Sequence, residues 1–125
     1  MCSSDLGMIL IIGGAGQGKL DYALEKTGCG PDQVARTPEE ARTRPIFAGL
    51  EQWPELDENE LLAANPDVIL ICDEVGCGVV PVDPAQRKRR EQVGRLCCRL
   101  AKRAERVERI FCGLPMVLKG EGPWN

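Results

Sequence analysis

The sequence contains no histidine, and its aromatic side chains are few: two Trp, two Phe and one Tyr. Without histidine, the chain has no imidazole ligand for a mixed cysteine and histidine zinc site. Its seven cysteines form no C-x-x-C pair, because Cys72 and Cys77 lie five residues apart and Cys97 and Cys98 are adjacent. These absences argue against a zinc site and a disulfide framework, and they favour free thiols in a reducing cytoplasm.

Long apolar runs are also absent from the sequence. No run reaches the roughly 18 apolar residues that cross a membrane, so we expect no membrane span. The first seven residues lack the charged and apolar regions of a signal peptide. A chain of 125 residues with 43% apolar content is long enough for one domain with its own core. We therefore expect a loose extension over residues 1–7, a single domain over 8–120 and a tail over 121–125.

Charge is unevenly distributed along the chain, although the formal net charge is only −3. Residues 32–74 are mainly acidic and residues 86–109 mainly basic. Such a basic segment is either a nucleic-acid contact or the solvated face of a helix. It contains no aromatic residue, so the stacking platforms that single-stranded nucleic acid uses are missing. We favour the helix face and expect no nucleic-acid partner.

Two continuous apolar runs are typical of strands buried on both faces of a parallel sheet. They extend from Met8 to Ile12 and from Val68 to Cys72. A further strand is predicted over residues 110–112, followed by a turn over 113–115 and a candidate edge strand over 116–119.

Helical patterns alternate with these strands. One helix is expected to follow Lys19 and to end at Gly28, and shorter helices are expected to begin after the capping residues Thr37 and Asp57. The longest should begin at Asp83, and its apolar stripe comprises Val93, Leu96, Cys97, Leu100, Ala104 and Val107. Strands that alternate with helices predict a three-layer α/β domain with a mainly parallel sheet.

A glycine-rich segment directly follows the first predicted strand. It reads GGAGQGK and fits the G-x-x-x-x-G-K pattern, in which backbone N–H groups surround nucleotide phosphates and the lysine contacts the β- and γ-phosphates. A tight turn without a ligand would explain the glycines but not the lysine. The predicted nucleotide-binding residues are Gly13, Gly14, Ala15, Gly16, Gln17, Gly18, Lys19 and Leu20.

Leu20 departs from the phosphate-loop pattern. The pattern has a Ser or Thr here, whose hydroxyl binds Mg²⁺. Mg²⁺ keeps several waters and takes few protein ligands, so we expect weaker metal binding rather than its loss.

Two carboxylates, Asp73 and Glu74, end the second buried strand. Ligands of open α/β sheets bind beyond the C-terminal ends of the strands, where a carboxylate can hold Mg²⁺ near the phosphates. Adjacent strand residues point to opposite faces, so only one of the two should face the nucleotide. The alternative is a solvated strand end or a helix cap. The predicted catalytic residues are Lys19, Asp73 and Glu74, with Asp73 as the metal ligand and ATP or GTP as the nucleotide.

The segment that begins at Glu74 resembles a known family. Residues 74–81, EVGCGVVP, are similar to the E-V-G-x-G-I/V-V-P motif of the bifunctional adenosylcobinamide kinase and adenosylcobinamide-phosphate guanylyltransferase family of cobalamin biosynthesis. Residues 87–91 resemble its R-x-x-R-D, and residues 113–119 its G-L-P-x-x-L-K. Residues 94–101 resemble its G-R-x-N-Q-x-L-A, with Cys97 and Cys98 in place of Asn and Gln.

The resemblance implies a P-loop, RecA-like α/β fold, a homotrimer and two reactions. The family transfers the γ-phosphate of ATP or GTP to a hydroxyl of adenosylcobinamide and then attaches GMP to that phosphate, with release of pyrophosphate. By this resemblance, Gly13, Gly18 and Lys19 would cradle the triphosphate and Glu74 would lie at the nucleotide.

One departure concerns the second reaction. Family members are longer, and their middle part carries a histidine that takes up GMP covalently, whereas this chain has none. We expect a compact adenosylcobinamide kinase. Whether it also transfers GMP is a question that the sequence leaves open. The alternative is a regulatory module that binds GTP or a corrinoid without catalysis.

Overall fold

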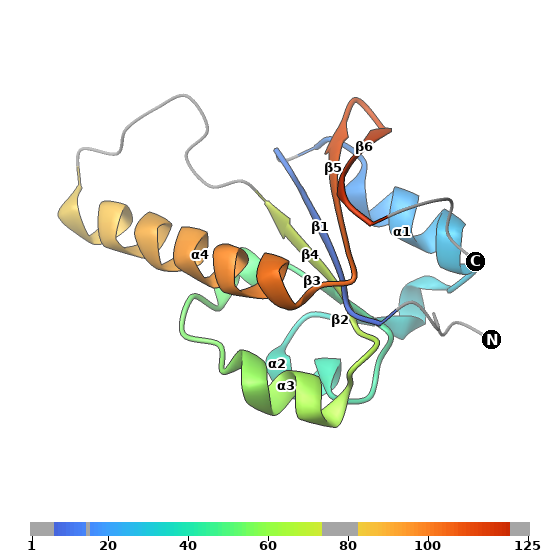
Figure 1. The fold of residues 1–125 in the computed structure, drawn as a ribbon, viewed down its shortest axis with the longest axis horizontal. Helices are drawn as coiled ribbons and strands as arrows, with labels where there is room; N and C mark the ends of the chain where they lie inside the picture. Colours follow the sequence, from blue (N-terminus) through green and yellow to red (C-terminus); the bar gives the residue numbers. More distant parts are fainter. Residues whose placement is uncertain (1–6, 15, 74–82, 121–125) are drawn as a thin grey trace.

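The computed structural model describes residues 7–14, 16–73 and 83–120 (Figure 1). Within these ranges the strands form one six-stranded sheet in the order β2-β3-β4-β1-β5-β6. All neighbouring strands are parallel except β5 and β6, so the predicted α/β class with a mainly parallel sheet is confirmed. The strands are β1 (Ile9–Gly13), β2 (Val34–Ala35), β3 (Ile46–Ala48), β4 (Ile69–Asp73), β5 (Arg106–Phe111) and β6 (Leu114–Lys119).

Helices cover both faces of the sheet and give the fold three layers (Figure 1). Successive strand residues point to opposite faces. Ile9 and Ile11 therefore pack with α1 on one face, and Leu10 packs with the helices on the other. None of the helices in the described ranges is long and apolar enough to cross a membrane. The helices are α1 (Lys19–Thr27), α2 (Pro38–Ala41), α3 (Glu58–Ala64) and α4 (Pro84–Arg103), with 3₁₀ turns η1 (Pro31–Gln33) and η2 (Leu50–Gln52).

The predicted helix caps are confirmed. Thr37 Oγ1 accepts a hydrogen bond from Glu40 N at 3.2 Å, at the start of α2. Asp57 and Asp83 cap α3 and α4 in the same way with their carboxylates. Gly28 ends α1 in the left-handed conformation, with φ of 73°, which glycine adopts without steric penalty.

The predicted end of the longest helix is wrong. The apolar stripe was expected to run through Val107, but α4 ends at Arg103 and Ala104 takes up extended backbone with ψ of 140°. Val107 is buried as expected, but in β5, where it pairs with Leu10 of β1. The antiparallel partner β6 also begins earlier than predicted, at Leu114 rather than Met116.

A buried charged cluster connects α1 to β5. Glu108 is fully buried, and its Oε2 accepts a hydrogen bond from Arg106 Nε at 2.8 Å. Its other oxygen, Oε1, accepts a hydrogen bond from Tyr22 Oη at 2.5 Å. Both contacts satisfy a carboxylate that would otherwise be costly to bury.

Gly94 lies in the exposed face of α4, where its flexibility lowers helix stability. An added Cβ would meet nothing within 4 Å. We expect Gly94→Ala to raise the free energy of unfolding by about 0.5–1 kcal/mol, because alanine loses less backbone entropy in a helix. Urea denaturation checks this result. Gly18→Ala is the contrasting variant, since φ of 86° at Gly18 strains any side chain; equal effects of both changes would contradict the argument.

An ion pair between Glu58 and Arg99 links α3 to α4. Arg99 Nε donates to Glu58 Oε1 at 2.7 Å, and this hydrogen bond lowers the pKa of Glu58 below its ordinary value of 4.5. The pair therefore stabilises the folded state above that value. It loses this effect as the pH falls, since the unfolded chain takes up the proton first.

Glu58→Gln should reduce the acid sensitivity of the fold. We expect its free energy of unfolding to fall less than that of wild type between about pH 7 and about pH 3. Urea denaturation across that range measures the difference, and the exposed Glu25→Gln serves as control. If the free energy of unfolding falls equally with pH in Glu58→Gln and in wild type, the ion pair with Arg99 does not contribute to the acid sensitivity of the fold.

Candidate functional site

The glycine-rich loop connects β1 to α1, as its sequence predicts. Gly16 and Gly18 adopt left-handed backbone, with φ of 75° and 86°. Gly13 lies so close to β5 that an added Cβ would come within 2.6 Å of Ile110 O. The loop therefore needs glycine at these positions for its shape alone.

The turn between β5 and β6 is hydrogen-bonded to this loop. Gly113 N donates a hydrogen bond to Gln17 O at 2.9 Å. Cys112 N donates to Gln17 Oε1 at 2.6 Å. These contacts fix the middle of the loop before any ligand is bound.

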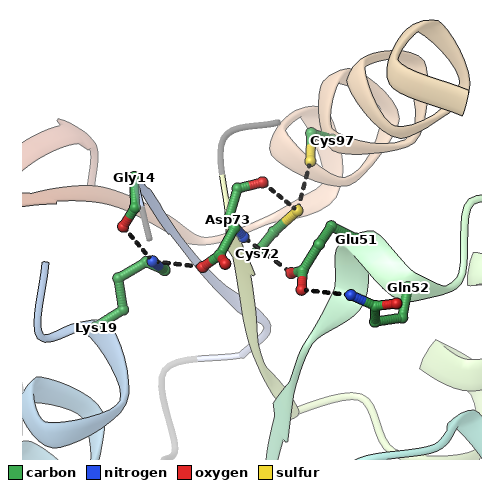
Figure 2. Close-up of polar contacts among 7 residues, drawn as sticks. All are labelled: Gly14, Lys19, Glu51, Gln52, Cys72, Asp73 and Cys97. Atoms are coloured by element: carbon green, nitrogen blue, oxygen red, sulfur yellow. Dashed lines mark hydrogen bonds and ion pairs between the residues drawn. The ribbon is translucent and has the colours of Figure 1, made fainter. Parts of the chain in front are cut away.

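Lys19 joins the loop to the end of β4 (Figure 2). It is only 5% exposed, and its Nζ lies 2.6 Å from Asp73 Oδ1. The same Nζ donates a hydrogen bond to Gly14 O at 2.7 Å. Since β1 pairs with β4 so that Gly13 is opposite Asp73, the sheet brings the two predicted residues together.

The main chain of Asp73 is held by Glu51, a residue that the sequence did not single out. Asp73 N donates to Glu51 Oε1 at 3.0 Å, and Gln52 Nε2 donates to Glu51 Oε2 at 3.4 Å (Figure 2). Glu51 lies in η2, directly after β3, and β3 pairs with β4. This pairing places a second carboxylate beside Asp73.

A cavity of about 280 Å³ lies at this edge of the sheet. Lys19 and Arg36 line it with positive charge, and Glu51 and Asp73 with negative charge. Arg36 is a further residue that no local pattern indicated. Leu20 also lines this cavity and packs against the apolar cluster around α1, so it offers no hydroxyl there.

The described residues include no group of three or more His, Cys, Asp or Glu placed to hold a metal ion. The nearby carboxylates of Glu51 and Asp73 are nevertheless oxygen donors of the kind that Mg²⁺ takes, together with water and phosphate oxygens. These donors fit a metal ion that arrives with a nucleotide, and Asp73 remains the predicted ligand.

Two predicted site residues, Ala15 and Glu74, lie outside the described residues. The same is true of the whole EVGCGVVP segment. Their predicted roles at the nucleotide stay predictions.

Two thiols lie together next to Asp73. Cys97 Sγ is 3.6 Å from Cys72 Sγ, and Cys72 Sγ donates to Asp73 O at 3.4 Å (Figure 2). The hydrogen bond with Cys97 and the burial of Cys72 raise the pKa of the Cys72 thiol far above its ordinary value. Cys72 is therefore a protonated thiol at neutral pH.

A larger cavity, of about 640 Å³, lies between α2, η2 and α3. Its walls combine Trp53 and Leu56 with the carboxylates of Glu39 and Glu60. Trp53 Nε1 donates to Arg36 O at 3.2 Å, so this cavity borders the wall of the smaller one.

Comparison with known proteins identifies a family whose sequence pattern this chain matches. Residues 50–118 match the family model described as cobinamide kinase / cobinamide phosphate guanyltransferase. The match includes Glu51, Asp73 and both thiols, but begins after the glycine-rich loop. The chain is also 44% identical over 54 residues to the bifunctional adenosylcobalamin biosynthesis protein CobP of Pseudomonas aeruginosa. This similarity covers 43% of the chain but only 31% of that protein, so the chain spans less than half of its length.

The family match agrees with the resemblance of the motifs after Asp73. It extends over more than half of the chain and includes strands β4 and β5, both of which pair with β1, and most of β6. The chain therefore belongs to the cobinamide kinase / cobinamide phosphate guanyltransferase family.

Proposed function

We propose that this chain phosphorylates adenosylcobinamide with the γ-phosphate of ATP or GTP. The observation that carries the proposal is the 2.6 Å contact between Lys19 and Asp73 at the glycine-rich loop. An ammonium beside a carboxylate, next to a glycine-rich loop, supplies the charges that a phosphotransferase uses for its phosphates and its metal ion, and this supports the proposal. The name of the family supports the substrate and the reaction.

Lys19 has a direct role in this reaction. Phosphate oxygens that enter the loop replace Gly14 O as acceptors for its ammonium, which then stabilises charge on the transferred phosphoryl group. The backbone N–H groups at the start of α1 add to this stabilisation.

Asp73 and Glu51 are the residues that would hold Mg²⁺. The ion would neutralise phosphate charge when bound. Asp73 gains freedom to bind it once Lys19 turns to the phosphates. Leu20 provides no hydroxyl, so we expect a weaker metal affinity than in loops with Ser or Thr.

Labelled nucleotide tests the proposal. The chain is incubated with Mg²⁺, adenosylcobinamide and GTP labelled at the α- or the γ-phosphate. Transfer of the γ-label to the corrinoid supports the kinase. Transfer of the α-label as well would mean that guanylyl transfer proceeds without histidine, which this chain lacks.

A regulatory module is the second candidate function, and Leu20 favours it. In this case the loop holds GTP or a corrinoid without transferring phosphate. Binding of GTP without movement of either label would overturn the kinase and support the module.

The larger cavity beside Trp53 is where we place the corrinoid. Its walls offer apolar surface for a macrocycle and carboxylates for amide groups. If adenosylcobinamide binds there, it should quench the fluorescence of Trp53. A quench of the same size in Trp53→Phe would contradict this placement.

Assembly into a homo-oligomer, a trimer by resemblance, is part of the proposal. The hairpin of β5 and β6 exposes apolar side chains that a second copy could cover. Light scattering on the purified chain measures the mass, and a monomer would overturn this part. The exposed side chains are Phe111, Leu114, Met116, Val117 and Leu118.

A further inference from the structure

We propose that Cys72 and Cys97 form an oxidisable dithiol site, which a peroxide converts into a disulfide that weakens nucleotide binding through Asp73. The two Sγ atoms are 3.6 Å apart, one at the end of β4 and the other on α4 (Figure 2). The sheet and the helix thus bring together two thiols that are 25 positions apart in the sequence.

A small oxidant has access to this pair. A cavity of about 250 Å³ is lined by Ile12, Cys72, Asp73, Arg90, Gly94 and Cys97. Cys97 is half-buried, whereas Cys72 is only 1% exposed. Cys97 therefore meets the oxidant first, and Cys72 is the second thiol behind it.

The chemistry balances with hydrogen peroxide as the oxidant. The sulfur of Cys97 attacks one peroxide oxygen, the O–O bond breaks, and a sulfenic acid and one water form. The sulfur of Cys72 then attacks the sulfur of Cys97, the S–O bond breaks, and the hydroxyl group leaves as a second water by taking up the proton of the Cys72 thiol. The two thiols lose two electrons and two protons, and an S–S bond forms between them. A small-molecule thiol reverses the reaction by exchange.

Formation of the disulfide changes the surroundings of Asp73. The Cys72 thiol now donates to Asp73 O, and a disulfide sulfur has no proton to donate. The sulfur atoms must also approach from 3.6 Å to about 2.05 Å. Both changes act on the residue whose side chain pairs with Lys19 and whose N–H donates to Glu51. We expect nucleotide affinity to fall about tenfold.

Mass spectrometry of the peroxide-treated full chain tests the disulfide directly. Trypsin leaves Cys97 and Cys98 in one peptide, LCCR, and Cys72 and Cys77 in another. Single variants must therefore identify the linked pair. We expect the cross-linked peptides in wild type, Cys98→Ser and Cys77→Ser, and their loss in Cys97→Ser and Cys72→Ser. No link in wild type, or a link that persists in Cys97→Ser, overturns the proposal.

Nucleotide affinity is then compared between reduced and oxidised wild type, with circular dichroism as the check of folding. A tenfold loss that dithiothreitol restores supports the coupling, and an unchanged affinity with the disulfide formed overturns it. This second part rests on the proposed function, but the first does not. If the reduced chain binds no nucleotide, the proposed function fails and mass spectrometry still decides the dithiol site.

Discussion

Lys19→Ala is expected to reduce γ-phosphate transfer to the corrinoid by about 100- to 1,000-fold, the usual loss when one preorganised charge is removed from a transition state. Lys19 brings a positive charge to the loop. Its ammonium contacts the backbone oxygen of Gly14 and the carboxylate of Asp73. The labelled-GTP assay measures the loss.

The fold should survive this change. Asp73 is 39% exposed, so water solvates its carboxylate after the lysine is removed. Lys26→Ala is the matched control, because Lys26 lies on the same helix but is exposed, with its Nζ 5.7 Å from the centre of the Tyr22 ring. Equal activity of Lys19→Ala and Lys26→Ala would show that Lys19 takes no part in the reaction.

Glu108→Ala is expected to lower the free energy of unfolding by about 3–5 kcal/mol, because it removes one partner of the buried ion pair between Glu108 and Arg106. Arg106 is only 6% exposed, and the hydrogen bond that Tyr22 Oη donates to Glu108 Oε1 is lost in the same change. Glu108→Gln should cost less, since its amide oxygen still accepts from Tyr22.

Urea denaturation measures both losses. The control is Glu91→Ala, which removes an ion pair with Arg95 at 3.8 Å. Both side chains of that pair are mostly exposed, so we expect a change of at most about 1 kcal/mol. A loss in Glu108→Ala no larger than in Glu91→Ala would show that the buried cluster adds little to stability.

Sequence patterns predicted the long elements of this fold but missed the short strands. β2 has two residues and β3 has three, which is too short for any hydrophobic period to be visible. The end of α4 was missed for another reason. Val107 continues the helical spacing by chance, but its pairing with Leu10 in β5 decides its conformation.

The candidate site shows the same division. The loop and Asp73 were found because each stands in a recognisable local pattern, and the pairing of β1 with β4 brings them together. Glu51 and Arg36 have no such pattern, and the apolar stripe that contains Cys97 predicts its burial but not its neighbour Cys72. Glu51, Arg36 and Cys97 reach the site only through the pairing of β3 with β4 and the packing of α4, which depend on residues far apart in the sequence.

The position of β1 in the sheet has a consequence for synthesis of the protein. Ile9 is made before both of its strand partners, Ile69 in β4 and Arg106 in β5. The loop is further held by Cys112 and Gly113, which leave the ribosome later still. During translation, the glycine-rich loop is therefore present before the neighbours that shape it have been made. The loop takes its final shape only after β4, β5 and the turn that follows β5 have been made.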